Sequence, residues 1–260
     1  MKKSLITGAL ITGAMFGALM AGSAMAADMP VKAPIMRAPP PPVFSWTGCY
    51  IGGGGGYGMW NQETFHETDP GHVATSPTET GGGRGWFGTV QAGCDYQLSG
   101  GLSSWVIGVQ GDWNWGNLKG TPNFASGNIG DEKNSWTWAA GGRIGYVVMP
   151  QLLAYVSGGY TEARFDQVNF VGAISGVPNG LFLGEHTYNN GWYIGSGYEY
   201  GVSFLPGLFW KTEYRYSEFQ AADLSHLVVG TGLSNGTASN SKKFIQTVRS
   251  ELVWRFNWFH

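Results

Sequence analysis

Charge is scarce in this chain. Only 12% of its 260 residues are Asp, Glu, Lys or Arg, whereas roughly 25% is usual in soluble domains. A soluble β-sandwich of this composition would be short of charged surface. The formal net charge of −2 gives no reason to expect a nucleic-acid partner. Beyond residue 26, no apolar run reaches the roughly 20 residues that a membrane-spanning helix needs.

Glycine and aromatic residues are abundant instead. The chain contains 43 Gly, 12 Trp, 12 Tyr and 14 Phe. Glycine at this density disfavours long helices, because each interior Gly costs about 1 kcal/mol relative to Ala. The aromatic content argues against a disordered chain. A β-rich protein with aromatic surface remains, and a membrane β-barrel fits that description best.

The N-terminal residues predict export through the Sec pathway. A pair of lysines precedes an apolar segment over residues 5–19, and Ala-Met-Ala at 24–26 has the small-residue pattern of a cleavage site. We therefore predict a signal peptide over 1–26, a Pro-rich periplasmic linker over 27–43 and a barrel over 44–260. A Pro-rich partner-binding motif is the alternative interpretation of the linker.

Apolar and polar residues alternate in eight segments, as in half-buried strands. These segments are Trp46–Trp60, Trp86–Gln97, Ser104–Asn117, Ser135–Val148, Leu152–Asp166, Asn190–Val202, Leu208–Glu218 and Lys243–Trp258. Long polar connections (61–85, 118–134, 167–189 and 219–242) alternate with short ones (98–103, 149–151 and 203–207). Strands with long loops at one end and short turns at the other predict an all-β, eight-stranded antiparallel up-and-down transmembrane β-barrel.

Aromatic residues fall toward both ends of these segments. The candidates at the long-loop end are Trp60, Trp86, Trp113, Trp136 and Trp192. Those at the short-turn end are Trp105, Trp210, Trp254 and Trp258. Two aromatic bands are typical of the interfacial girdles of a membrane barrel. A sandwich core has no reason to separate its aromatic residues in this way.

Charges of both signs lie on the opposite face of the strands. They are Asp112, Arg143, Glu199, Lys211, Glu213, Arg215, Arg249, Glu251 and Arg255. Buried charges have to be paired, and side chains fill the interior of an eight-stranded barrel. We therefore predict a paired polar plug, with a small-diameter pore as the alternative.

The two cysteines, Cys49 and Cys94, lie on the first two segments and are predicted to point outward near the short-turn end. The exported compartment is oxidising, which favours a bridge between them. The strict geometry of a disulfide could forbid it. A cross-strand disulfide and two free thiols both remain open.

Motifs for catalysis or metal binding do not occur in the sequence, which has no Ser-x-Gly elbow, no HExxH and no Cys/His metal spacing. We predict no enzymatic activity, no cofactor and no metal. Four histidines fall in predicted loops and one is terminal, namely His66, His72, His186, His226 and His260. Imidazole suits haem iron and transition metals, so a haemin- or ligand-binding surface protein is an alternative to solvent-exposed loop histidines.

Several stretches resemble the small alphaproteobacterial porin-family outer-membrane proteins, which have an opacity- or OmpA-type eight-stranded barrel. They include FSWTGCYIGGGGGYG at 44–58, GWYIGSGYEYGV at 191–202 and TVRSELVWRF at 247–256. The resemblance implies an outer-membrane location, a role as a major surface protein that supports the envelope, and contact with lipid and lipopolysaccharide. It implies no shared catalytic residues.

The same resemblance implies partners for assembly and anchoring. Phe256 or Phe259 would provide the C-terminal aromatic that the barrel-assembly machinery recognises. The terminus at residues 27–28 would attach to or approach peptidoglycan. We expect the protein to be a monomer.

Overall fold

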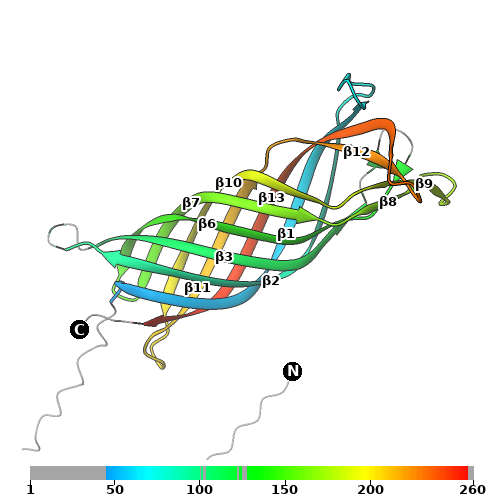
Figure 1. Ribbon diagram of the computed structural model, residues 1–260. Helices are drawn as coiled ribbons and strands as arrows, with labels where there is room; N and C mark the ends of the chain where they lie inside the picture. Colours follow the sequence, from blue (N-terminus) through cyan, green and yellow to red (C-terminus); the bar gives the residue numbers. More distant parts are fainter. Residues whose placement is uncertain (1–44, 100, 102–103, 122, 125–127, 257–260) are drawn as a thin grey trace, which may run out of the picture. The chain divides into compact units, whose positions relative to one another are not determined.

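The described residues of the computed structural model are 45–99, 101, 104–121, 123–124 and 128–256. Eight long strands form a closed ring in which each strand pairs antiparallel with both neighbours (Figure 1). In ring order they are β1 (Gly48–Thr68), β2 (Glu79–Gln97), β3 (Trp105–Gly120), β6 (Glu132–Met149), β7 (Leu152–Phe165), β10 (His186–Gly201), β11 (Leu208–Glu218) and β13 (Ser234–Phe256). Pairing of β1 with β13 closes the ring. The predicted eight-stranded up-and-down barrel is thereby confirmed.

Shorter strands extend the sheet at the long-loop end (Figure 1). They are β4 (Asn123–Phe124), β5 (Asn128–Ile129), β8 (Val168–Gly172), β9 (Pro178–Leu183) and β12 (Ala222–Val228). β12 pairs with β13, and β9 and β8 follow in order from it. No helix in the described part of the chain has the length and apolar character needed to cross a membrane. The predicted signal peptide and linker, over residues 1–43, lie outside the described residues.

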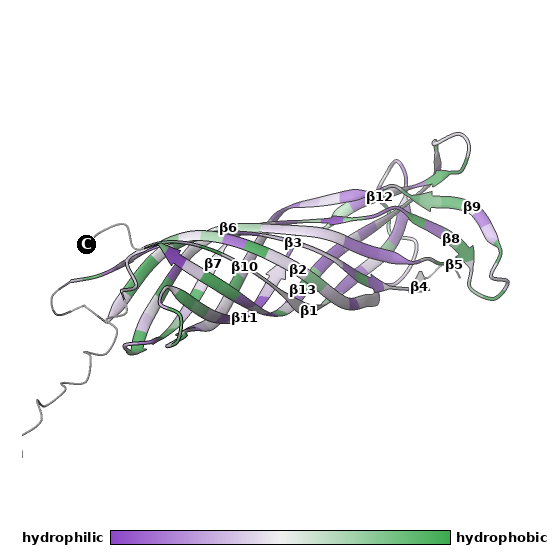
Figure 2. Ribbon diagram, turned by 90° about the horizontal axis from the view of Figure 1, so that it is seen from below, coloured by the Kyte–Doolittle hydropathy of each residue, from purple (hydrophilic) through white to green (hydrophobic). Residues whose placement is uncertain are grey.

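Alternate residues of each barrel strand point inward and outward, because successive side chains of a strand lie on opposite faces. On β13, Arg249, Glu251 and Val253 are buried in the interior, whereas Val248 and Leu252 are exposed on the outer face. Figure 2 shows the resulting hydrophobic and hydrophilic segments along the strands. The outer face is therefore apolar, as contact with lipid requires.

Strands β1 and β13 continue well beyond the predicted ends. The first predicted segment stops at Trp60, but the paired ladder runs on to Thr68 opposite Thr237. Gln62 and Thr64 are buried inside this extension. The prediction of loops over 61–85, 167–189 and 219–242 was wrong for most of their length. Polar residues dominate both faces of the β1 extension, in which Phe65 is the one apolar residue, so the sequence shows no hydrophobic alternation although backbone hydrogen bonds still form the ladder.

Gly56 makes room for an aromatic ring in the narrow interior. A Cβ atom at this position would lie 2.6 Å from Cζ of Phe87. Phe87 belongs to an apolar cluster inside the barrel. The glycine run of β1 thus allows bulky side chains from neighbouring strands to fill the barrel.

Candidate functional site

The interior charges are arranged in layers, the first of which lies nearest the short turns. Arg143 and Arg255 each form ion pairs with both Asp95 and Glu199, at N–O distances between 2.5 and 2.7 Å. All four side chains are buried. Two cations balance two anions, as the low-dielectric interior requires.

A second layer, nearer the long loops, contains three cations and three anions. These are Lys211, Arg215, Arg249, Asp112, Glu213 and Glu251. Arg249 lies 3.0 Å from Asp112 and 2.6 Å from Glu213, and Arg215 lies 2.8 Å and 2.9 Å from the same two acids. Lys211 lies 3.7 Å from Glu213 and 3.9 Å from Glu251. This layer is also formally neutral.

Apolar clusters lie toward both ends of these charged layers. The cluster toward the short turns is formed by Trp46, Tyr50, Val106, Leu153, Phe209 and Val253. The cluster toward the long loops is formed by Trp60, Phe87, Leu118, Ala163, Phe165, Tyr188, Phe219 and Ile245. A cavity of about 20 Å³ beside Arg215 and Leu118 has room for roughly one water molecule. The described interior is therefore filled by side chains.

One further ion pair lies beside the cluster toward the long loops. Lys243 Nζ lies 2.6 Å from Glu132, and 4.7 Å and 4.8 Å from the ring centroids of Phe165 and Trp60. Cation–π contact with these rings adds to the stabilisation of the buried ammonium group.

All nine charged residues predicted to face the lumen are buried there. Sequence reasoning missed Asp95, Glu132 and Lys243, and also Gln91, whose amide lies 2.8 Å from Glu251 and 2.5 Å from Lys211. Asp95 and Gln91 have the inward parity of their predicted segment, so the alternation could have identified them. Glu132 lies outside the predicted segments, where no alternation indicates its direction.

Most of the predicted girdle tryptophans lie on the outer face. Exposed side chains there are Trp86, Trp113 and Trp192 toward the long loops, and Trp105, Trp210 and Trp254 toward the short turns. Trp136 is half-buried because it stacks on Trp113, with ring centroids 4.9 Å apart. Trp258 lies outside the described residues.

Trp60 is a correction to that set. It is 0% exposed and belongs to the interior apolar cluster. Its indole Nε1 donates a hydrogen bond to the carbonyl oxygen of Leu118. Met59, its neighbour, points outward and is exposed, so the two-residue period of the strand directs Trp60 inward.

Of the two aromatic residues predicted as the assembly signal, Phe256 lies within the described residues. Phe256 ends β13 on the outer face and is exposed. Phe259 lies outside the described residues.

Cys49 and Cys94 are directly opposite in the β1–β2 register. The structure joins them in a disulfide, with Cα atoms 3.9 Å apart. Both residues are exposed on the outer face. The bridge therefore fastens the first two strands to one another near the short-turn end.

Two of the predicted loop histidines are buried together in the extension of the barrel. His66 lies on β1 and His226 on β12, with ring centroids 5.2 Å apart. His226 hydrogen-bonds the hydroxyls of Thr237 and Ser239 at 2.9 and 2.8 Å. Burial, followed by the charge of the neighbouring His66, lowers the pKa of His226 to about 4. Burial also lowers the pKa of His66, which Glu79 partly offsets.

The interpretation of these two histidines as solvent-exposed loop residues was wrong, because the long connections are themselves sheet. His186 is also on a strand, half-buried against Tyr188. Burial, followed by the charge of Lys243, lowers the pKa of His186. His72 is the exposed one, and His260 lies outside the described residues.

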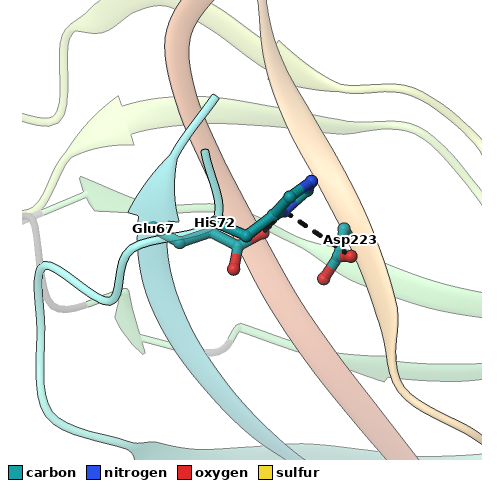
Figure 3. A group of neighbouring side chains, drawn as sticks. All are labelled: Glu67, His72 and Asp223. Atoms are coloured by element: carbon teal, nitrogen blue, oxygen red, sulfur yellow. Dashed lines mark hydrogen bonds and ion pairs between the residues drawn. The ribbon is translucent and has the colours of Figure 1, made fainter. Parts of the chain in front are cut away.

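Glu67, His72 and Asp223 meet where the turn after β1 approaches β12 (Figure 3). His72 Nδ1 lies 2.8 Å from Glu67 Oε1 and 3.7 Å from Asp223 Oδ2. The hydrogen bond to Glu67 is the main reason that the pKa of His72 is raised. One imidazole nitrogen and two carboxylate oxygens are a donor set that a zinc-type ion accepts. As arranged, the three side chains form a polar contact between this turn and β12.

Comparison with known proteins gives a consistent set of relatives. The chain is 31% identical over 247 residues to the 31 kDa outer-membrane immunogenic protein of Brucella melitensis, covering 88% of this chain and 92% of that protein. It is 26% identical over 211 residues to the 22 kDa outer membrane protein of Rhizobium leguminosarum, covering 80% of each. No family model matches the chain.

A solved structure that aligns with this chain is that of the outer membrane protein OprG from Pseudomonas aeruginosa. It aligns with 81% of this chain and 97% of its own, at 9% identity and a TM-score of 0.45.

Proposed function

Since the chain belongs to the family of outer-membrane proteins that includes the Brucella 31 kDa outer-membrane immunogenic protein, we propose that its barrel is sealed rather than conducting. The protein is an outer-membrane surface protein with a structural role. In this proposal the barrel anchors the chain in the membrane, and the strands beyond the long-loop girdle carry the surface contacts. Closure of the ring satisfies the backbone hydrogen bonds that lipid cannot satisfy.

The observation that supports a sealed barrel is the sequence of layers inside it. Two neutral charge layers lie between two apolar clusters. Ions crossing this interior would have to separate buried pairs such as Arg143–Glu199, which leaves uncompensated charge in a low dielectric. Removing one member of such a pair typically costs about 3–5 kcal/mol.

Single-channel recording in a planar bilayer tests the proposal. Wild-type protein, inserted as a folded barrel, is expected to give no discrete conductance steps. Two comparison variants each remove one side chain from the interior: Glu199→Ala from the charge layer nearest the short turns, and Trp60→Ala from the apolar cluster toward the long loops. Reproducible conductance steps from the wild type would overturn the proposal, since they require a continuous aqueous path.

A structural rather than enzymatic role is also part of the proposal. The charged side chains of the barrel interior form ion pairs with one another. The names of the relatives describe outer-membrane proteins and state no enzymatic activity. An enzyme of the outer membrane would need a nucleophile or base accessible to substrate.

We further propose that export and assembly follow the sequence predictions. Cleavage after Ala26 would leave the linker over 27–43 in the periplasm, and the C-terminal aromatics would present the chain to the barrel-assembly machinery. Mass spectrometry of the mature N-terminus tests the cleavage site.

Attachment of the N-terminus to peptidoglycan is a separate proposal with its own experiment. Sacculi purified from cells are digested to fragments and searched for peptides that begin at Ala27. Recovery of such peptides joined to muropeptides is the expected result. Sacculi that release none would contradict attachment without affecting the barrel.

A further inference from the structure

Three basic residues lie side by side on the outer face of adjacent strands. Arg84 on β2 is opposite Lys119 on β3, and Lys119 is opposite Lys133 on β6. Directly opposed residues of an antiparallel pair project from the same face, with Cβ atoms about 5 Å apart. The three side chains therefore form one row, which we name the basic row.

The basic row lies just beyond the long-loop aromatic girdle. Arg84 is two residues from Trp86 on β2 and points to the same side, which places it about 7 Å farther from the membrane centre along the strand. Lys119 and Lys133 likewise lie beyond Trp115 and Trp136 on their strands. Girdle tryptophans mark the boundary between hydrocarbon and headgroups. The row thus faces the headgroup region of the outer leaflet.

Like charges placed directly opposite one another destabilise a sheet. Among the described residues, Lys133 pairs with Asp166 at 3.3 Å, whereas Arg84 and Lys119 have no ion pair. Other outer-face cations of the long-loop region are neutralised: Lys242 lies 2.6 Å from Glu218. Two positive charges of the basic row therefore have no counter-charge from the described part of the protein.

We propose that the basic row binds a phosphoryl group of lipopolysaccharide in the outer leaflet. The Arg84 guanidinium supplies a planar pair of donors that suits phosphate, and the ammonium groups supply charge. Trp86, which is 74% exposed beside the row, would pack against the acyl chains below the phosphate. The proposal depends on the outer-membrane location and is independent of whether the barrel conducts.

Lipid-dependent thermal stability provides the experiment. Full-length folded protein is reconstituted in phosphatidylcholine vesicles that contain diphosphorylated lipid A or the same lipid after enzymatic dephosphorylation. Unfolding is followed by the gel-mobility shift of the folded barrel. The phosphorylated lipid is expected to raise the unfolding midpoint of the wild type, and the dephosphorylated lipid to leave it unchanged.

The double variant Arg84→Gln/Lys119→Gln is expected to lose this response. Two charge-assisted hydrogen bonds are removed, so the lipid concentration that gives half of the shift should rise about tenfold or more. Lys242→Gln is the matched control, because Lys242 is already paired with Glu218. It should respond to the lipid as the wild type does. Relief of like-charge repulsion should leave the double variant at least as stable as the wild type without lipid.

Two results would overturn the inference. An equal lipid response in the double variant would place the phosphate elsewhere. Equal stabilisation of the wild type by free inorganic phosphate would indicate an adventitious anion site rather than a lipid headgroup site. Conductance of the wild type would contradict the sealed barrel while leaving this inference intact, so the two failures are distinguishable.

Discussion

Acidification should weaken the pairing of β12 with β13 around His226. This side chain is buried between β12 and β13, with its ring edge-on to Phe170 and to His66. Its two ring nitrogens contact hydroxyls. The carboxylate of Glu79 raises the pKa of His66, which burial lowers by more. A proton on His226 would therefore place a positive charge beside His66 with no carboxylate in contact with the His226 ring among the described residues. Local opening of β12 exposes the imidazole to water, where it accepts a proton readily.

The magnitude follows from the pKa of His226, which falls from 6.5 in the open state to about 4 in the folded sheet. Because the folded pKa is depressed, the unfolded segment binds more protons, and stability is complete above pH 6.5 and declines as pH falls toward 4. The full difference is roughly 3 kcal/mol. At about pH 4.5 most of it is lost, on the order of a 50-fold increase in the open population.

Hydrogen–deuterium exchange of the amides in Ala222–Val228 measures this opening. Protection factors, corrected for the intrinsic pH dependence of exchange, should fall by roughly 50-fold between pH 7 and about pH 4.5. Amides of β13 within the membrane, around Val248, provide the internal reference and should stay protected. His226→Gln keeps a polar group near the hydroxyls but does not titrate, so its protection should depend much less on pH. Constant wild-type protection, or an identical decline in the variant, would refute the reasoning.

Three further predictions concern the barrel itself. Glu199→Gln should lower the unfolding free energy by about 3–5 kcal/mol, because Arg143 loses a charged partner; an unchanged midpoint in a denaturant titration would contradict this. Reduction of the Cys49–Cys94 bridge opens a loop of 45 residues and should cost up to about 4 kcal/mol; the Cys49→Ser variant should match the reduced protein and be insensitive to reductant. Brominated lipids should quench Trp86 but not Trp60, as single-tryptophan variants would report; equal quenching would refute the inward assignment of Trp60.

Much of the barrel was predictable because its membrane part obeys a simple period. Lipid on one side and a packed interior on the other force alternation along each strand. Together with the turn residues between segments, this alternation located the eight strands, although it was weak in the Gly-rich first segment and ambiguous over Leu152–Asp166. It also assigned the nine lumen charges to the interior, although it could not indicate which acid pairs with which base. Those pairings, such as Arg143 with Asp95, depend on strand register and on the shear of the barrel.

The region beyond the girdle was predicted less well. Residues from Gln62 to Thr68 are polar on both faces of β1 apart from Phe65, so no hydrophobic alternation separates this strand from a loop. The burial of His226 depends on the pairing of β12 with β13, which the spacing of residues in the sequence does not reveal. The basic row likewise appears only when the register places Arg84 opposite Lys119. Sequence alternation therefore predicts the direction of a side chain but not its neighbours across the sheet.

Closure of the ring by its first and last strands also sets the order of events during biogenesis. β1 and β13 pair continuously from Cys49–Phe256 to Thr68–Thr237, so one edge of β1 has no partner until β13 is in place. Until then both edges are open templates for pairing with other chains. Contacts between the two ends of a sequence also form slowly. The chain must therefore be protected from aggregation until the ring closes, and a truncation that removes β13 would leave an unsealed sheet rather than a smaller barrel.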